Sequence, residues 1–116
     1  MNNATIIGNL TRDPELAYTN SQKAVCKFTV AVNRFKEGAD YIRVVAWNRT
    51  AENCNRYLKK GRRVAVNGEI RTGSYKKGGV TIPTFEIWAN NIEFGYENTP
   101  LNDDAGFAEM DETLPF

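Results

Sequence analysis

The sequence predicts an all-β domain in which five strands close into a small Greek-key barrel, with one helix between the third and fourth strands. Three features of the 116 residues carry this prediction. Short segments of alternating apolar and polar residues recur over the first 94 residues, and glycines interrupt several of them at positions suited to sharp bends. Only one segment places its apolar residues at helical spacing instead.

The first strand is expected at residues 3–10, where Gly8 indicates a bulge or a sharp bend. A turn follows at residues 12–15, and residues 16–19 can resume the strand. The second strand, at residues 24–32, has the clearest alternation. All of its even-numbered residues are apolar, so we expect them to face the barrel interior together.

The third strand runs from Asp40 to Trp47, after a loop or hairpin end at residues 33–39. One of its faces is small and apolar: Ile42, Val44 and Ala46. The other face holds Tyr41, Arg43, Val45 and Trp47. This second face cannot lie inside the barrel, because an unpaired buried guanidinium costs several kcal/mol. Judged from this strand alone, the outward rings either hold unpaired nucleic-acid bases or cover a neighbouring element or subunit.

The single helix is expected from Ala51 to about Lys60, with Thr50 as its cap, because a threonine hydroxyl can accept an unpaired backbone N–H. A narrow apolar stripe at helical spacing consists of Ala51, Cys54 and Leu58. Gly61 follows as a left-handed stop.

The fourth strand is expected at residues 63–72, with a second bend at Gly68. Residues 73–83 read as a hairpin loop that carries Tyr75, Lys76 and Lys77, and residues 84–94 as the fifth strand. Five strands with one helix between the third and fourth is the arrangement of the OB-fold.

Composition divides the chain into an OB-fold domain at residues 1–95 and a flexible acidic tail at residues 96–116. The tail is rich in proline, asparagine and acidic residues and has little periodicity, which predicts disorder.

Charge follows the same division. The 15 basic residues lie between Arg12 and Lys77, and with the eight acidic residues of positions 1–94 they give that part a net charge of +7. Positions 95–116 hold six acidic residues and no basic one, a net charge of −6. A basic body with an acidic tail predicts two different partners, one of them a polyanion.

Composition also argues against several other classes of protein. No apolar run reaches the length of a membrane span, and the N-terminus lacks the features of a signal peptide, so we expect no membrane partner and a cytoplasmic protein. Cys26 and Cys54 fit apolar faces, which predicts buried free thiols in a reducing compartment. With no histidine and no third cysteine, we expect no structural zinc site, and no cofactor.

Several segments, in their order along the chain, make it resemble the bacterial-type single-stranded DNA-binding proteins, the SSB family. They are Ile7-Gly8-Asn9-Leu10, Arg12-Asp13-Pro14-Glu15, Phe28-Thr29-Val30-Ala31-Val32-Asn33-Arg34, Arg43-Val44-Val45 with Trp47, Ala51-Glu52, Tyr57-Leu58-Lys59-Lys60-Gly61 and Val66-Asn67-Gly68-Glu69. Any one of these segments would be a weak signal, whereas their order and spacing together are specific.

The resemblance implies an OB-fold that forms homotetramers and wraps single-stranded DNA. It places the stacking aromatics near Phe35, Tyr41, Trp47 and Tyr75. Tyr41 and Tyr75 stand where many relatives carry tryptophan, so their stacking area is reduced. The family usually has an aliphatic residue at Trp88, and we therefore expect packing or an interface there.

Eleven basic residues are candidates for phosphate contacts. Seven of them are selected as binding residues: Arg12, Arg34, Arg43, Arg49, Arg71, Lys76 and Lys77. The other four are Lys27, Arg56, Arg62 and Arg63. Because phosphates and base faces carry little sequence information, we expect binding that ignores sequence and weakens with salt.

The C-terminal tip is a second predicted site, for a protein partner. It comprises Asp111, Glu112, Leu114, Pro115 and Phe116. The resemblance implies that an apolar end after acidic residues recruits replication, recombination and repair proteins. Thr113 and Leu114 depart from the acidic residue and the isoleucine that are typical of the family.

The predicted function is thus non-enzymatic: sequence-independent binding and protection of single-stranded DNA. An RNA-binding or primosomal OB-fold protein is the alternative, since stacking rings do not exclude RNA. A nuclease would need a carboxylate cluster for metal ions or a general base, and the acidic residues of the body are scattered. A pure protein-interaction module predicts no salt-sensitive DNA binding. If the chain comes from a chromosome or plasmid, the protein would be associated with the nucleoid; if from a phage, it would act in the host cytoplasm.

Overall fold

The structure is a computed structural model that describes residues 1–95. Six strands and one helix follow one another in this part of the chain: β1 (Ala4–Leu10), β2 (Glu15–Tyr18), β3 (Ala24–Asn33), β4 (Ala39–Trp47), α1 (Asn48–Tyr57), β5 (Arg63–Lys77) and β6 (Val80–Phe94). The predicted tail and its tip residues lie outside the described residues.

Five of the strands close into a ring, which confirms the predicted barrel. Its order is β1-β5-β6-β4-β3, and β3 returns to β1 through the pairs Asn9↔Ala31 and Leu10↔Val30. The neighbours pair antiparallel except β4 and β6, which run parallel. This closed, uneven sheet has the arrangement of an OB-fold.

The sixth strand, β2, is the segment that was expected only to resume the first strand. It pairs with the first half of β3, from Glu15↔Lys27 to Tyr18↔Ala24, and lies outside the ring. β1 pairs with the second half of β3. β1 and β2 are therefore two separate strands, with the turn after β1 between them.

The helix begins earlier than predicted and ends at Tyr57 instead of near Lys60, so neither Thr50 nor Gly61 caps it. Trp47 precedes the first turn and makes no side-chain capping hydrogen bond, while Asn48 has a φ of 56°. Asparagine tolerates this left-handed conformation, so the chain turns directly from β4 into α1 and Thr50 falls inside the helix. None of the helical segments in residues 1–95 is long and apolar enough to cross a membrane.

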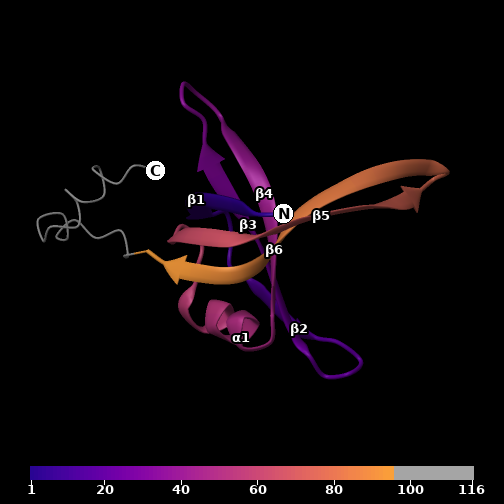
Figure 1. The fold of residues 1–116 in the computed structure, drawn as a ribbon, viewed down its shortest axis with the longest axis horizontal. Helices are drawn as coiled ribbons and strands as arrows, with labels where there is room; N and C mark the ends of the chain where they lie inside the picture. Colours follow the sequence, from indigo (N-terminus) through magenta and orange to yellow (C-terminus); the bar gives the residue numbers. More distant parts are fainter. Residues whose placement is uncertain (96–116) are drawn as a thin grey trace, which may run out of the picture.

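The predicted loop at residues 73–83 is instead a continuous two-stranded arm. Pairing of β5 with β6 runs through Ser74↔Pro83 and Tyr75↔Ile82 as far as Lys77↔Val80. Gly78 and Gly79 make the turn with φ angles of 60° and 82°, a geometry that favours two glycines between twisted strands. Figure 1 shows this hairpin extending far from the barrel, and the β3–β4 hairpin projecting in another direction.

The predicted bend at Gly68 is confirmed as an irregularity in the β5–β6 pairing, between Asn67 and Gly68. A Cβ atom at Gly68 would lie 2.1 Å from the carbonyl oxygen of Trp88, so only glycine allows the strands to approach this closely. Gly8 lies equally tightly against Ala31, where β1 leaves β5 for β3.

The core contains the alternating residues that the sequence predicted. Val30, Val44, Val64, Val66 and Ile87 from the ring strands are almost completely buried. The same cluster includes Ala51 and Cys54 of α1, Leu58 directly after the helix, and Cys26 of β3.

Candidate nucleic-acid interface

Four adjacent strands, β5, β6, β4 and β3, present one outer face opposite the core. On β4 this face carries Tyr41 and Arg43, both exposed as predicted. Cross-strand pairing puts Arg43 between Thr29 of β3 and Glu86 of β6. Val45 also lies on this side, as the alternation along the strand predicted, but it is only 2% exposed.

Val45 is buried because its cross-strand neighbours have long side chains. Lys27 of β3 flanks it on one side and Trp88 of β6 on the other. The outer face is therefore open around Tyr41 and Arg43 and closed further along β4.

A hollow of about 410 Å³ lies on the open part of this face and brings three predicted site residues together. It is lined by Thr11, Arg12, Asp13, Glu15, Lys27, Phe28, Thr29, Tyr41 and Arg43. Of these, Tyr41 is a predicted stacking residue, and Arg12 and Arg43 are predicted phosphate-binding residues. Lys27 is a third cation. The carboxylates of Asp13 and Glu15 line the same hollow, so cations exceed acids there by one. A ring beside cations can hold a base and its flanking phosphates at the same time.

The turn after β1 forms one wall of the hollow. Asp13 accepts a hydrogen bond from the backbone N–H of Lys60 at 2.8 Å, which ties this turn to the segment after α1. The wall that carries Arg12 is thereby fixed to the barrel.

The β3–β4 loop carries Phe35, whose ring is 97% exposed. At the base of the loop, Arg34 donates to Asp40 at 2.7 Å, and the loop closes through a 2.9 Å backbone hydrogen bond from Arg34 to Gly38. The hydrogen bond with the Arg34 guanidinium lowers the pKa of Asp40 and raises the pKa of Arg34. Arg34 is thus at the predicted place, but its charge is shared with a carboxylate.

The β5–β6 arm carries the other predicted ring. Tyr75 is 51% exposed, and Lys76 and Lys77 follow it toward the glycine turn. Since residues 71–80 are all exposed, nothing in the described chain covers this basic, aromatic arm.

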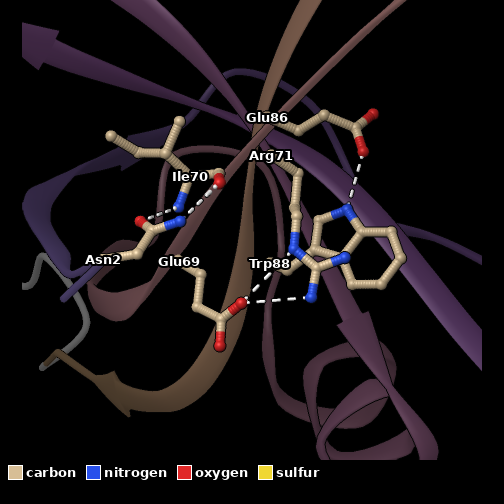
Figure 2. Close-up of polar contacts among 6 residues, drawn as sticks. All are labelled: Asn2, Glu69, Ile70, Arg71, Glu86 and Trp88. Carbon is tan, nitrogen blue, oxygen red and sulfur yellow. Dashed lines mark hydrogen bonds and ion pairs between the residues drawn. The ribbon is translucent and has the colours of Figure 1, made fainter.

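Trp47 and Arg71 occupy a different environment from the hollow. The rings of Trp47 and Trp88 lie with their centroids 5.5 Å apart and tilted by 53°. The guanidinium carbon of Arg71 lies 4.2 Å above the Trp88 ring, and Glu69 accepts from the Arg71 guanidinium at 3.1 Å (Figure 2). Trp88 is therefore packed, as expected, and Trp47 is half-buried against it.

The remaining predicted phosphate residue, Arg49, is exposed in the first turn of α1 and does not line the hollow. The tip residues Asp111, Glu112, Leu114, Pro115 and Phe116 lie outside the described residues, so the structure places none of them.

Reading the sequence missed the acidic partners of the outer face. Glu69 holds Arg71, and Glu86 accepts a hydrogen bond from the indole N–H of Trp88 at 2.9 Å. Glu69 and Glu86 alternate with the core residues of β5 and β6, which indicates that both lie on the outer face. The residues that they contact depend on how the strands pair, so the sequence alone does not identify them.

The two cysteines are free and buried, as predicted. Burial raises the pKa of Cys26 to about 11 and that of Cys54 to about 12, with smaller contributions from Glu15 and from Cys26 respectively. Across residues 1–95, no three Asp, Glu, Cys or His side chains form a group that could hold a metal ion.

A closed barrel of this strand order is an OB-fold, a class that includes proteins that bind nucleic acids through stacking and charge. Comparison with known families agrees with this class. The profile of the single-strand binding protein family matches residues 1–95, and the chain belongs to that family.

Curated relatives cover most of the chain. "Single-stranded DNA-binding protein 3" of Listeria innocua is 43% identical over 101 residues, or 81% of this chain and 63% of its own length. "Single-stranded DNA-binding protein B" of Bacillus subtilis is 41% identical, covering 80% of this chain and 88% of its own length. "Single-stranded DNA-binding protein 2" of Clostridium acetobutylicum is 38% identical over 99% of this chain and 94% of its own length. The chain thus spans just under two thirds of the Listeria protein.

Proposed function

We propose that this chain is a non-enzymatic protein that binds and protects single-stranded DNA without regard to sequence. The observation that carries the proposal is the hollow in which Arg12, Tyr41 and Arg43 meet on the outer face of the barrel. Membership of the single-strand binding protein family and the names of the relatives support it.

In this proposal, bases stack on exposed rings and phosphates pair with neighbouring cations. Tyr41 takes a base in the hollow, while Arg12 and Arg43 meet the phosphates on either side of it. Each stacked base contributes about 1–3 kcal/mol, and each phosphate contact adds a dependence on salt. Neither interaction reads a base edge, so affinity is largely independent of sequence.

The two hairpins extend the interface beyond the hollow. Phe35 with Arg34 on the β3–β4 loop, and Tyr75 with Lys76 and Lys77 on the β5–β6 arm, offer ring-and-cation pairs that are exposed within residues 1–95. Trp47 offers a half-buried stacking ring at the end of β4, and Arg49 adds a charge at the start of α1.

Fluorescence anisotropy with labelled oligo-dT, duplex DNA of equal length and oligo-rU tests the proposal at several salt concentrations. We expect tight binding of oligo-dT, much weaker binding of duplex DNA, and a linear fall of log affinity with log salt. Equal affinity for duplex would contradict the proposal, whereas clear preference for oligo-rU would favour the alternative of an RNA-binding or primosomal protein.

We further propose that the tail tip recruits replication, recombination and repair proteins. The motivation is its composition: the acidic Asp111 and Glu112 stand before the apolar Leu114, Pro115 and Phe116. Removing residues 114–116 should abolish binding to such partners and leave oligo-dT affinity unchanged. Loss of both together would count against a separate partner site.

A homotetramer is the proposed assembly, on the strength of family membership. Sedimentation equilibrium of the full chain should give four times the mass of one chain. A monomer at micromolar concentration would refute it.

A further inference from the structure

The ring of Trp47 packs against the ring of Trp88, and no hydrogen bond from the described residues holds it. Its indole N–H is buried and has no hydrogen-bond partner among the described residues. A buried N–H without a partner costs free energy, so something else must keep the ring in this place. The ring of Trp88 lies 5.5 Å away between centroids.

Trp88, in contrast, is fixed by polar contacts on its edge and on one face. Its indole N–H donates to Glu86 at 2.9 Å, and the Arg71 guanidinium lies 4.2 Å from the ring centroid. A cation over the face of a tryptophan is attracted by the electrons of the ring. The indole therefore has little freedom to turn.

Arg71 is in turn held on β5. Glu69 accepts from its Nε at 3.3 Å and its Nη2 at 3.1 Å. Between these two residues, the backbone of Ile70 both accepts from and donates to the side-chain amide of Asn2, at 3.0 and 2.9 Å (Figure 2). The contacts form a continuous series across three strands, from Glu69 through Arg71 and Trp88 to Trp47.

We propose that Trp88 is a positioning residue: it holds the Trp47 ring at the angle at which that ring stacks on a base. Arg71 supports the Trp88 ring, a role that we call the brace. Its guanidinium contacts Trp88 and Glu69 instead of binding a phosphate. The inference rests on the proposed function, because it assigns Trp88 a role through the stacking of Trp47.

A double-mutant cycle with the full chain and labelled oligo-dT tests this role. Trp47→Leu should weaken binding about 10- to 100-fold, the effect of losing a stacked base. Trp88→Leu should weaken it about three- to tenfold, a part of that effect. In the Trp47→Leu background, Trp88→Leu should have no further effect, because Trp88 acts only through the Trp47 ring.

A spectroscopic reading separates positioning from a loss of folding. The chain has two tryptophans, so Trp88→Leu leaves Trp47 as the only tryptophan that emits. Its emission should shift to longer wavelength as the ring and its N–H become hydrated. Trp88→Phe keeps a ring at this place and should restore both the emission and most of the affinity. If the leucine variant does not fold, Trp88→Phe still tests the role, because a full loss of oligo-dT affinity in a variant that keeps a ring at this place would count against positioning by packing.

A second ring pair provides a matched control away from the outer face. Tyr57 of α1 and Phe94 of β6 have centroids 5.7 Å apart and the same 53° tilt. Tyr57→Leu breaks this pair and should leave oligo-dT affinity unchanged.

Arg71→Met tests the brace. We expect weaker binding with an unchanged slope of log affinity against log salt. Arg43→Gln should lower that slope by about one, as the loss of a phosphate contact does. A comparable fall of the slope in Arg71→Met would show that Arg71 contacts a phosphate and would overturn its role as a brace.

Three results would overturn the positioning role. If Trp88→Leu weakens binding equally in both backgrounds, Trp88 contacts the DNA itself. If Trp47→Leu weakens binding and Trp88→Leu does not, the positioning role is wrong while the proposed function stands. If Trp47→Leu has no effect, stacking on Trp47 is wrong, and the inference fails with it.

Discussion

Replacing Tyr41 by leucine removes an exposed aromatic ring from the hollow. The ring is 67% exposed and takes no part in the core, so the free energy of unfolding should change by less than about 0.5 kcal/mol. Any loss of DNA affinity can then be attributed to the missing ring.

The size of the loss follows from what a stacked base contributes. About 1–3 kcal/mol corresponds to about 5- to 150-fold in affinity. Tyr41 lies on an open surface, and its ring is smaller than an indole, so we expect the lower part of this range, about 5- to 30-fold. Tyr41→Trp should tighten binding a few-fold, because it enlarges the stacking area.

Anisotropy titrations with labelled oligo-dT at several salt concentrations measure both the affinity and its salt dependence. Tyr41→Leu removes no charge and should keep the slope of the wild-type chain. Arg43→Gln changes the neighbouring side chain in the same hollow and should lower the slope by about one. The reasoning is refuted if Tyr41→Leu binds like wild type, or if it lowers the slope as the Arg43 variant does.

Three further predictions concern the fold and the tail. Gly68→Ala should destabilise the domain by about 3 kcal/mol in urea unfolding, since its Cβ would lie 2.1 Å from a carbonyl oxygen, whereas Gly73→Ala, 3.3 Å from a threonine hydroxyl, should cost less than about 1 kcal/mol. Stability should fall as pH rises from about 9 toward about 11, because burial raises the pKa of Cys26 and Cys54 and the unfolded chain then loses its thiol protons first. Replacing both cysteines by alanine should remove this part of the pH dependence, and an unchanged profile would contradict it. Deleting residues 103–116 should tighten oligo-dT binding at low salt if the acidic tail competes for the basic surface, and an unchanged affinity would end that hypothesis.

The barrel was predictable because its strands carry their pattern locally. Alternation in residues 24–32 and around Val44 marked the core residues, and Gly68 marked the bend. The helix start was not predictable in this way, since it depends on the left-handed backbone of Asn48.

The arm was misread because glycines, lysines and Pro83 reduce the propensity for strands. Those residues are tolerated because the arm is two-stranded, so its strands have free edges where a proline does not interrupt pairing. The two glycines at its turn were the available signal for a tight hairpin.

The site was predictable in part. Parity on one strand identified Tyr41 and Arg43 as outward residues, and the structure brings both to the hollow with Arg12. The contact of Trp47 with Trp88 arises from the parallel pairing of β4 with β6. The sequence pattern of neither strand indicates that the two strands pair.

The most direct test of the central claim is a titration of intrinsic tryptophan fluorescence with oligo-dT and with duplex DNA. Trp47 and Trp88 both lie on the outer face of the barrel, so single-stranded DNA bound there should quench their emission. The account predicts strong quenching by oligo-dT and little by duplex, reversed by salt. No quenching by oligo-dT, or equal quenching by duplex, would contradict it.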